Sequence, residues 1–265
     1  MDATIITILT SLCASSIIGI GIGLLGAGGS LLIMPVLVYI LGMTPSSATT
    51  YSLGIVGISS LFAALRMQVQ KNPPFNIIAS FSICSMLSAL CMRSMIAYLP
   101  ETFSFGVIHM RMDSISMIVL AIMMFISAYG MIFTKEIHTN DQEHSSLLML
   151  SLLGALVGAL TGFTGIGGGF IIVPVMVLYG KMAISDAVYT SMIVIAMNAI
   201  PSFMNDCYNG NTPDWILFGL LTISSILGGM IGIKISIHIH QEHLRRIFGI
   251  IILGLSFFII FNELI

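Results

Sequence analysis

Charged residues are scarce in this chain of 265 residues: Asp, Glu, Lys and Arg make up only 8%, whereas 57% of the residues are hydrophobic. A soluble domain could not hide so much apolar surface from water, so the composition excludes a soluble fold and indicates a polytopic membrane protein whose partner is the lipid bilayer. Nine Lys and Arg against eleven Asp and Glu give a net charge of −2. This balance offers no basic patch, and we predict no nucleic-acid binding.

Cysteine is also sparse, and its four occurrences lack the spacing of metal ligands. They lie in or beside apolar stretches, where we expect small buried thiols: Cys13, Cys84, Cys91 and Cys207. The tract HIHQEHLRR contains three histidines, but no cysteine or carboxylate set completes a metal site there, and a solvated basic loop explains it better. We therefore predict no metal and no cofactor.

Long polar segments are missing as well, and ten apolar runs account for most of the chain. They are Ala3–Leu25, Gly28–Leu41, Ala48–Leu65, Phe75–Leu99, Ile115–Phe133, Leu147–Phe163, Gly167–Tyr179, Ala187–Met204, Trp215–Ile237 and Leu244–Phe261. The second run would be only about 21 Å long as a helix, against about 30 Å for a hydrocarbon core. We predict an all-α, polytopic transmembrane helical bundle, a single membrane domain over 1–265, in which the second and seventh runs are broken or re-entrant short helices.

Two glycine-rich stretches of matching spacing divide the chain into related halves. GLLGAGGSLLIMP (23–35) and GFTGIGGGFIIVP (162–174) align with an offset of 139 residues, and the same offset pairs Met43 with Met182 and Pro74 with Pro213. We predict one repeat over about 3–133 and a second over about 147–262, joined by a polar cytoplasmic linker over about 134–146. Because each repeat holds five runs, the second repeat would enter the membrane from the opposite face, as an inverted-topology repeat.

The cations favour this topology over one with eight crossings and two parallel halves. With ten crossings, seven cations fall on one face and two on the other; with eight, the split is six against three. The seven are Arg66, Lys71, Lys135, Lys181, Lys234, Arg245 and Arg246, and the two are Arg93 and Arg111. We therefore expect inverted halves with both termini outside.

The glycine-rich stretches predict an anion site. Irregular backbone at membrane depth survives only where protein or a water-lined cavity covers it. A helix that begins just after such a break presents free N–H groups and the positive end of its dipole. The predicted binding residues are Gly26, Gly28, Gly29, Ser30 and Pro35 in the first repeat and Gly165, Gly167, Gly168, Gly169 and Pro174 in the second. The alternative is that these glycines only let helices pack closely.

Polar residues in the runs that follow are secondary candidates for the anion site. They are Thr50, Ser52, Thr190, Ser191 and Asn198. Each hydroxyl could equally bond a carbonyl of its own helix, and Asn198 could bridge backbone groups freed by Pro201. Every acidic residue lies at or near the end of a run, so proton coupling would have to use Asp186, a histidine or a proton carried by the substrate.

The paired glycine motifs, with ATTYSL and AVYTSM after them, resemble the TauE/SafE sulfite exporter family, and the resemblance covers nearly the whole chain. It implies a multi-pass transporter of the bacterial inner membrane that moves sulfite, sulfonates or related small anions, often as an exporter. The family is usually described with seven or eight helices, which agrees with ten runs only if the short ones are re-entrant. The first repeat has Ser30 where the second has Gly169. In the first repeat Tyr51 also separates Thr50 from Ser52, whereas Thr190 and Ser191 are adjacent in the second, so the two half-sites are unequal.

We therefore expect a secondary transporter of a small anionic substrate, and not an enzyme. An anion channel could use the same motif, and gradient-coupled, saturable flux would separate the two. An intramembrane enzyme using His109, His238 or a thiol is a weaker alternative, because few polar residues converge away from the run ends. No sequence feature decides whether the chain forms homo-oligomers.

Overall fold

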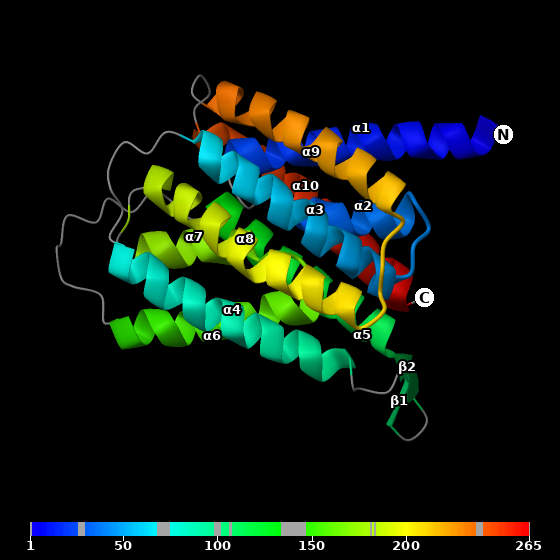
Figure 1. Ribbon diagram of the computed structural model, residues 1–265, viewed down its shortest axis with the longest axis horizontal. Coiled ribbons are helices and arrows are strands. Elements are labelled where there is room, and N and C mark those ends of the chain that lie inside the picture. Colours follow the sequence, from blue (N-terminus) through cyan, green and yellow to red (C-terminus); the bar gives the residue numbers. More distant parts are fainter. Residues whose placement is uncertain are drawn as a thin grey trace.

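The computed structural model describes residues 2–25, 30–67, 75–97, 102–105, 108–133, 147–180, 182, 184–236 and 241–264. Over these residues the chain forms ten helices (Figure 1). They are α1 (Asp2–Leu25), α2 (Ile33–Tyr39), α3 (Pro45–Arg66), α4 (Phe75–Ala97), α5 (Met112–Phe133), α6 (Leu147–Thr164), α7 (Gly169–Leu178), α8 (Ile184–Tyr208), α9 (Trp215–Ser236) and α10 (Gln241–Leu264). Each helix covers or lies within one predicted apolar run, so the predicted helical bundle is confirmed.

A short antiparallel hairpin precedes α5 and was not anticipated from the sequence. Strands β1 (Thr102–Phe105) and β2 (Ile108–Arg111) pair so that Thr102 lies opposite Arg111 and Phe105 opposite Ile108. Figure 1 shows the hairpin projecting from one end of the helical bundle. It is a small addition to an otherwise helical fold.

Several of the helices have the length and the outer surface of membrane spans. Five of those in the described part of the chain are long and apolar enough to cross a bilayer: α3, α4, α6, α8 and α9. Large apolar side chains cover their outer faces, including Leu65, Leu148 and Ile216, which are 76%, 72% and 77% exposed. A water-soluble protein rarely exposes such continuous apolar surface, whereas lipid accepts it. The fold is therefore that of a polytopic membrane protein.

Local signals set the start of two of these spans. Thr44 precedes α3, and its hydroxyl accepts the backbone N–H of Ser47 at 3.4 Å, while Pro45 occupies the first helical position. Asp214 precedes α9 in the same way, and its Oδ1 accepts the N–H of Ile216 at 2.9 Å. Both caps satisfy backbone donors that the first turn of a helix leaves without a carbonyl partner.

Helices α1, α3 and α9 run in one direction. As the residue numbers rise along one helix, those of the residues that it contacts on its neighbour rise as well, which shows that the two helices are parallel. Between α1 and α9 the contacts pair Ser15 with Leu221, Gly19 with Ser225 and Gly23 with Gly229. Between α3 and α9 they pair Tyr51 with Asp214, Gly54 with Phe218 and Ser59 with Ser225.

Helices α4, α6 and α8 form a second parallel set. Between α4 and α6 the contacts pair Phe81 with Gly154, Ser85 with Gly158 and Ala89 with Gly162. Between α4 and α8 they pair Ser85 with Asn198 and Arg93 with Asp206. Between α3 and α8 the order is reversed: Thr50 meets Asp206, Gly54 meets Phe203 and Gly57 meets Ile200. The two sets are therefore antiparallel to each other (Figure 1).

These directions are those of an inverted repeat. By the sequence offset, α1 corresponds to α6, α3 to α8 and α4 to α9, and each pair runs in opposite directions. The eight-crossing alternative requires α3 to run opposite to α1, but the two are parallel, so that alternative is wrong. The segments that contain α2 and α7 must return the chain across the bundle. Because α2 has 7 residues and α7 has 10, their helices span only about 10 and 15 Å.

Small residues hold the two outer helix pairs close together, and they do so at equivalent positions. A Cβ on Gly19 or Gly23 of α1 would collide with a carbonyl oxygen of α9, and a Cβ on Gly158 or Gly162 of α6 would collide with one of α4. These glycines are packing residues, as in other close membrane helix pairs. Their partners Ser225 and Gly229 on α9 correspond to Ser85 and Ala89 on α4. The offset between α4 and α9 is therefore 140 residues, one more than the sequence motifs indicate.

The thiols are less buried than expected. Cys13 and Cys91 are exposed on the outer surface, while Cys84 and Cys207 are partly buried. The prediction of buried thiols was wrong for the first two, because an apolar helix in a membrane protein offers as many lipid-facing positions as interior ones.

Candidate functional site

The second glycine-rich stretch forms a break between two helices. Helix α6 ends at Thr164 and α7 begins at Gly169, and between them Gly165 and Gly168 adopt left-handed φ angles of +69° and +71°. Glycine adopts this conformation readily, whereas a side chain would be strained. Ile171 and Ile172 both donate to the carbonyl of Gly168. The N–H groups of Gly169 and Phe170 come earlier in the first turn and have no carbonyl acceptor within the helix.

The break lies against the other half of the molecule. A Cβ on Gly165 would collide with the Cγ2 methyl of Thr49 on α3. A Cβ on Gly167 would come within 2.9 Å of Val56 on α3 and within 2.5 Å of Ile195 on α8. Because both positions carry glycine, the start of α7 can pack closely at the interface between the repeats, with Gly167 near the middle of α3. Pro174 lies inside α7, where it removes one helical hydrogen bond.

The first glycine-rich stretch is described only in part. Gly26, Gly28 and Gly29 lie outside the described residues. Ser30 is fully buried and opens a short 3₁₀ turn that leads into α2, of which Pro35 is the third residue. Both short helices thus follow a glycine-rich stretch and carry the expected proline.

The predicted hydroxyl candidates are buried, but most bond protein atoms. Thr50 donates to Asp206 Oδ2 at 2.9 Å, Ser191 donates to the carbonyl of Val188 in its own helix, and Thr190 lies 3.7 Å from the sulfur of Met182. The Oγ of Ser52 is buried with no partner in the structure. The alternative that a serine bonds its own helix therefore applies to Ser191, whereas Ser52 keeps its hydrogen-bonding capacity.

Asn198 belongs to a polar pair that occurs twice in the bundle, each time between a helix of the first half and a helix of the second. Its Nδ2 donates to Ser85 Oγ on α4 at 2.6 Å, and it does not bridge the backbone around Pro201 as the sequence allowed. The equivalent positions are Ser59 and Ser225, whose hydroxyls lie 3.0 Å apart between α3 and α9. The Oδ1 of Asn198 is buried without a partner. The second half therefore holds a free acceptor where the first half has a serine hydroxyl.

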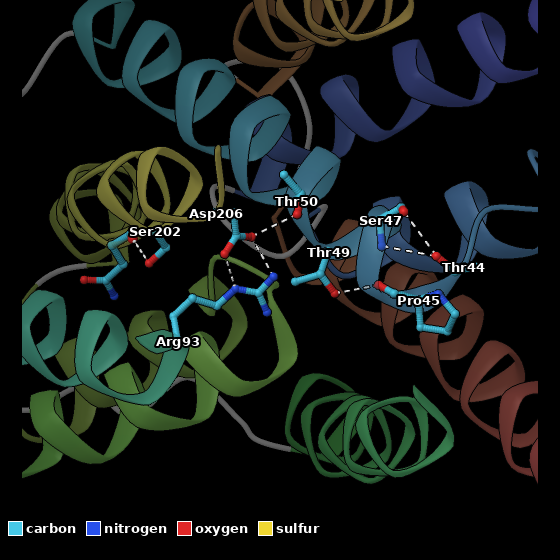
Figure 2. Close-up of polar contacts among 9 residues, drawn as sticks. Thr44, Pro45, Ser47, Thr49, Thr50, Arg93, Ser202 and Asp206 are labelled. Carbon is cyan, nitrogen blue, oxygen red and sulfur yellow. Dashed lines mark hydrogen bonds and ion pairs between the residues drawn. The ribbon is translucent and has the colours of Figure 1, made fainter. Parts of the chain in front are cut away.

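A buried ion pair between Arg93 and Asp206 joins the two halves (Figure 2). Arg93 of α4 donates from Nε to Asp206 Oδ1 at 2.7 Å and from Nη2 to Asp206 Oδ2 at 2.6 Å. The two side chains are 8% and 5% exposed, and Thr50 donates to the same carboxylate. The cluster is close to the break, because Thr49 precedes Thr50 and contacts Gly165.

Comparison with known proteins identifies the family of the chain. A family model described as "Sulfite exporter TauE/SafE" matches residues 9–259, which include part or all of every helix. The chain belongs to the TauE/SafE family.

Curated relatives of this TauE/SafE chain carry the name "Probable membrane transporter protein". One from Xylella fastidiosa (strain 9a5c) is 24% identical over 98% of the chain and 97% of the relative. Another, MJ0441 from Methanocaldococcus jannaschii, is 27% identical over 86% of each, and YjnA from Bacillus subtilis is 25% identical over 89% of the chain and 93% of the relative. No solved structure matches the chain significantly.

Sequence reasoning did not place Arg93 and Asp206 in the candidate site of this TauE/SafE protein. Arg93 was counted as a cation at one membrane face, but it is buried inside α4 and should not be counted there. A lone arginine within an apolar run was the available signal, because such a residue has to find an interior partner. Asp206 lies near the end of α8, as expected, but it is 4% exposed and paired, not solvated.

Proposed function

We propose that this protein is a secondary transporter of small oxyanions, such as sulfite or organosulfur and sulfonate compounds, and that it works as an exporter at the bacterial inner membrane. The family description supports the substrate class and the direction. The inverted arrangement of the two halves supports alternating access, in which one half rocks against the other around a central site.

The observation that carries the proposal is the position of the break at Gly165–Gly168 against α3 of the other half. In this place the first turn of α7 points free N–H groups and the positive end of its dipole toward the repeat interface. We place the anion at Gly168 and Gly169, with Asn198 as a neighbouring polar group. The equivalent residues of the first repeat, Gly26 to Ser30, would complete the site.

The mechanism needs no covalent chemistry. An anion that enters from one side replaces part of its hydration shell with backbone N–H groups at the start of α7. Contact with residues from both halves gives the anion a different affinity in each conformation of the bundle, and only such a difference can shift the equilibrium between conformations. Movement of one half then exposes the anion to the other side.

Flux in proteoliposomes tests this function. Purified protein is reconstituted, and uptake of labelled sulfite, thiosulfate and a simple sulfonate is measured against protein-free vesicles. We expect saturable uptake of at least one of the three anions that depends on an imposed gradient. Flux equal to that of protein-free vesicles for all three would reject the proposal, and non-saturable flux would indicate a channel.

A further inference from the structure

Among the residues that the structure describes, the ion pair between Arg93 and Asp206 has no counterpart at the equivalent helix contact near the other end of the bundle. The repeat offsets place Ile233 at the position of Arg93, Met67 at that of Asp206 and Tyr189 at that of Thr50. Each of these three residues packs against an apolar cluster formed by Ala63, Ala64, Val188 and Met192. The same helix contact is therefore apolar at one end of the molecule and ionic at the other.

This difference indicates that the fold does not require the ion pair. Replacing a buried ion pair with well-packed apolar residues is often neutral or stabilising, because two charges lose their hydration on burial. The contact between α3 and α9 shows that apolar residues can fill this position in the same architecture. An ionisable residue kept inside a membrane protein at such a cost is a candidate functional group.

The geometry of the pair matches the recognition of an oxyanion. Two nitrogens of Arg93 meet two oxygens of Asp206 at 2.7 and 2.6 Å. Sulfite, sulfonates and carboxylates all present pairs of oxygens that fit a guanidinium in this way. The carboxylate of Asp206 therefore occupies the position that a substrate oxyanion would take on Arg93.

The pair is also placed where the halves must separate. Arg93 lies four residues before the end of α4 and Asp206 two residues before the end of α8, so the contact is within about 6 Å of one end of the bundle. Thr50, which bonds Asp206, follows directly on Thr49, the residue that contacts the glycine break.

We propose that Arg93 is an anion-binding residue whose partner is exchanged during transport, an inference that rests on the proposed function. The incoming oxyanion replaces Asp206 on the guanidinium, and Asp206 keeps its bond to Thr50. The exchange removes the link between α4 and α8 and opens this end of the bundle. The apolar contact at the opposite end separates without a bound anion.

Measurements of sulfite binding to variants of Asp206 and of Arg93 test the exchange. In detergent, Asp206→Asn removes the competing charge, and we expect it to lower the Kd for sulfite at least about tenfold, or about 1.4 kcal/mol. Arg93→Gln is expected to raise the Kd by a similar factor. A purely structural ion pair would instead lower stability in both variants and leave the two Kd values equal to that of the wild type, and that outcome would overturn the proposal. Sodium chloride at matched ionic strength is the control ligand.

Two further variants keep the test informative if a single charge substitution prevents folding. Thr50→Val retains both charges but removes the bond that Asp206 keeps after the exchange, so sulfite should bind more weakly than to the wild type. The double variant Arg93→Ile with Asp206→Met copies the apolar contact of the other end and should fold but bind sulfite weakly. Unchanged sulfite affinity in both variants would contradict the exchange, while wild-type flux would still support the transporter.

Discussion

Gly165 in the break before α7 packs against the Cγ2 methyl of Thr49 on α3, in the other half of the protein. The hydroxyl of Thr49 bonds the carbonyl of Pro45 in its own helix at 2.8 Å, so the methyl group faces the glycine. This contact fixes the start of α7 at the interface between the repeats. The position of the proposed anion site follows from it.

The crossing pattern predicts which connections share a side of the membrane. Helices α3 and α8 are antiparallel, and Thr50 near the start of α3 bonds Asp206 near the end of α8. Ser46 and Asn211 therefore lie at the same end of the bundle, whereas Arg66 lies at the other end. All three side chains are exposed. In a variant without native cysteines, Ser46→Cys and Asn211→Cys should react with a membrane-impermeant maleimide from the same side and Arg66→Cys from the opposite side. Labelling of Ser46→Cys and Asn211→Cys from opposite sides would favour eight crossings.

The repeated small-residue contacts predict matched losses of stability in the two halves. Gly19→Ala and Gly158→Ala each place a methyl group against a backbone carbonyl of the partner helix, of Ser225 and Ser85 respectively. Overpacking of this kind costs about 1–3 kcal/mol. Thermal unfolding in detergent should show a lower Tm for both variants, by similar amounts.

Gly254→Ala on α10 is the matched control for these substitutions, because an added Cβ there meets open space. We expect its Tm to equal that of the wild type. A drop confined to one of the two test variants would show that the two helix interfaces are not equivalent.

The polar pair between α4 and α8 predicts a measurable coupling. A double-mutant cycle with Asn198→Ala and Ser85→Ala should give a coupling energy of about 0.6 kcal/mol, the average for hydrogen bonds between membrane helices. Asn198→Ser should be more stable than Asn198→Ala, because it reproduces the pair that Ser59 and Ser225 form at 3.0 Å. Equal stabilities of the two variants would show that the bond to Ser85 contributes nothing.

The sequence predicted the helices and their inversion because both depend on local patterns. Apolar runs give the spans, and the register of the two glycine motifs gives the correspondence between α1–α3 and α6–α8. The one-residue shift in α9 was missed, because it appears only when Gly158 and Gly19 are compared through their partners Ser85 and Ser225. Local sequence carries no information about which residues face each other across two halves.

The same limit applies to the ionic cluster. Arg93 and Asp206 are 113 residues apart, and only the packing of α4 on α8 brings them together. An arginine within an apolar run indicates that the residue has an interior partner, but it does not identify that partner. The partners of the serine and threonine hydroxyls could not be predicted either, because Thr50 bonds Asp206 on another helix whereas Ser191 bonds a carbonyl of its own helix.

The most direct test of the account is sulfite flux in proteoliposomes containing the Gly165→Ala variant. Alanine at a φ of +69° costs about 1–2 kcal/mol and collides with Thr49, so the start of α7 must move away from α3. We predict that flux falls at least about tenfold, while the variant still elutes as a single folded species. The control Gly254→Ala should keep wild-type flux. Adding Thr49→Ser to Gly165→Ala removes the colliding methyl and should restore part of the lost flux. Wild-type flux in a correctly folded Gly165→Ala variant would contradict the claim that the break at the repeat interface forms the transport site.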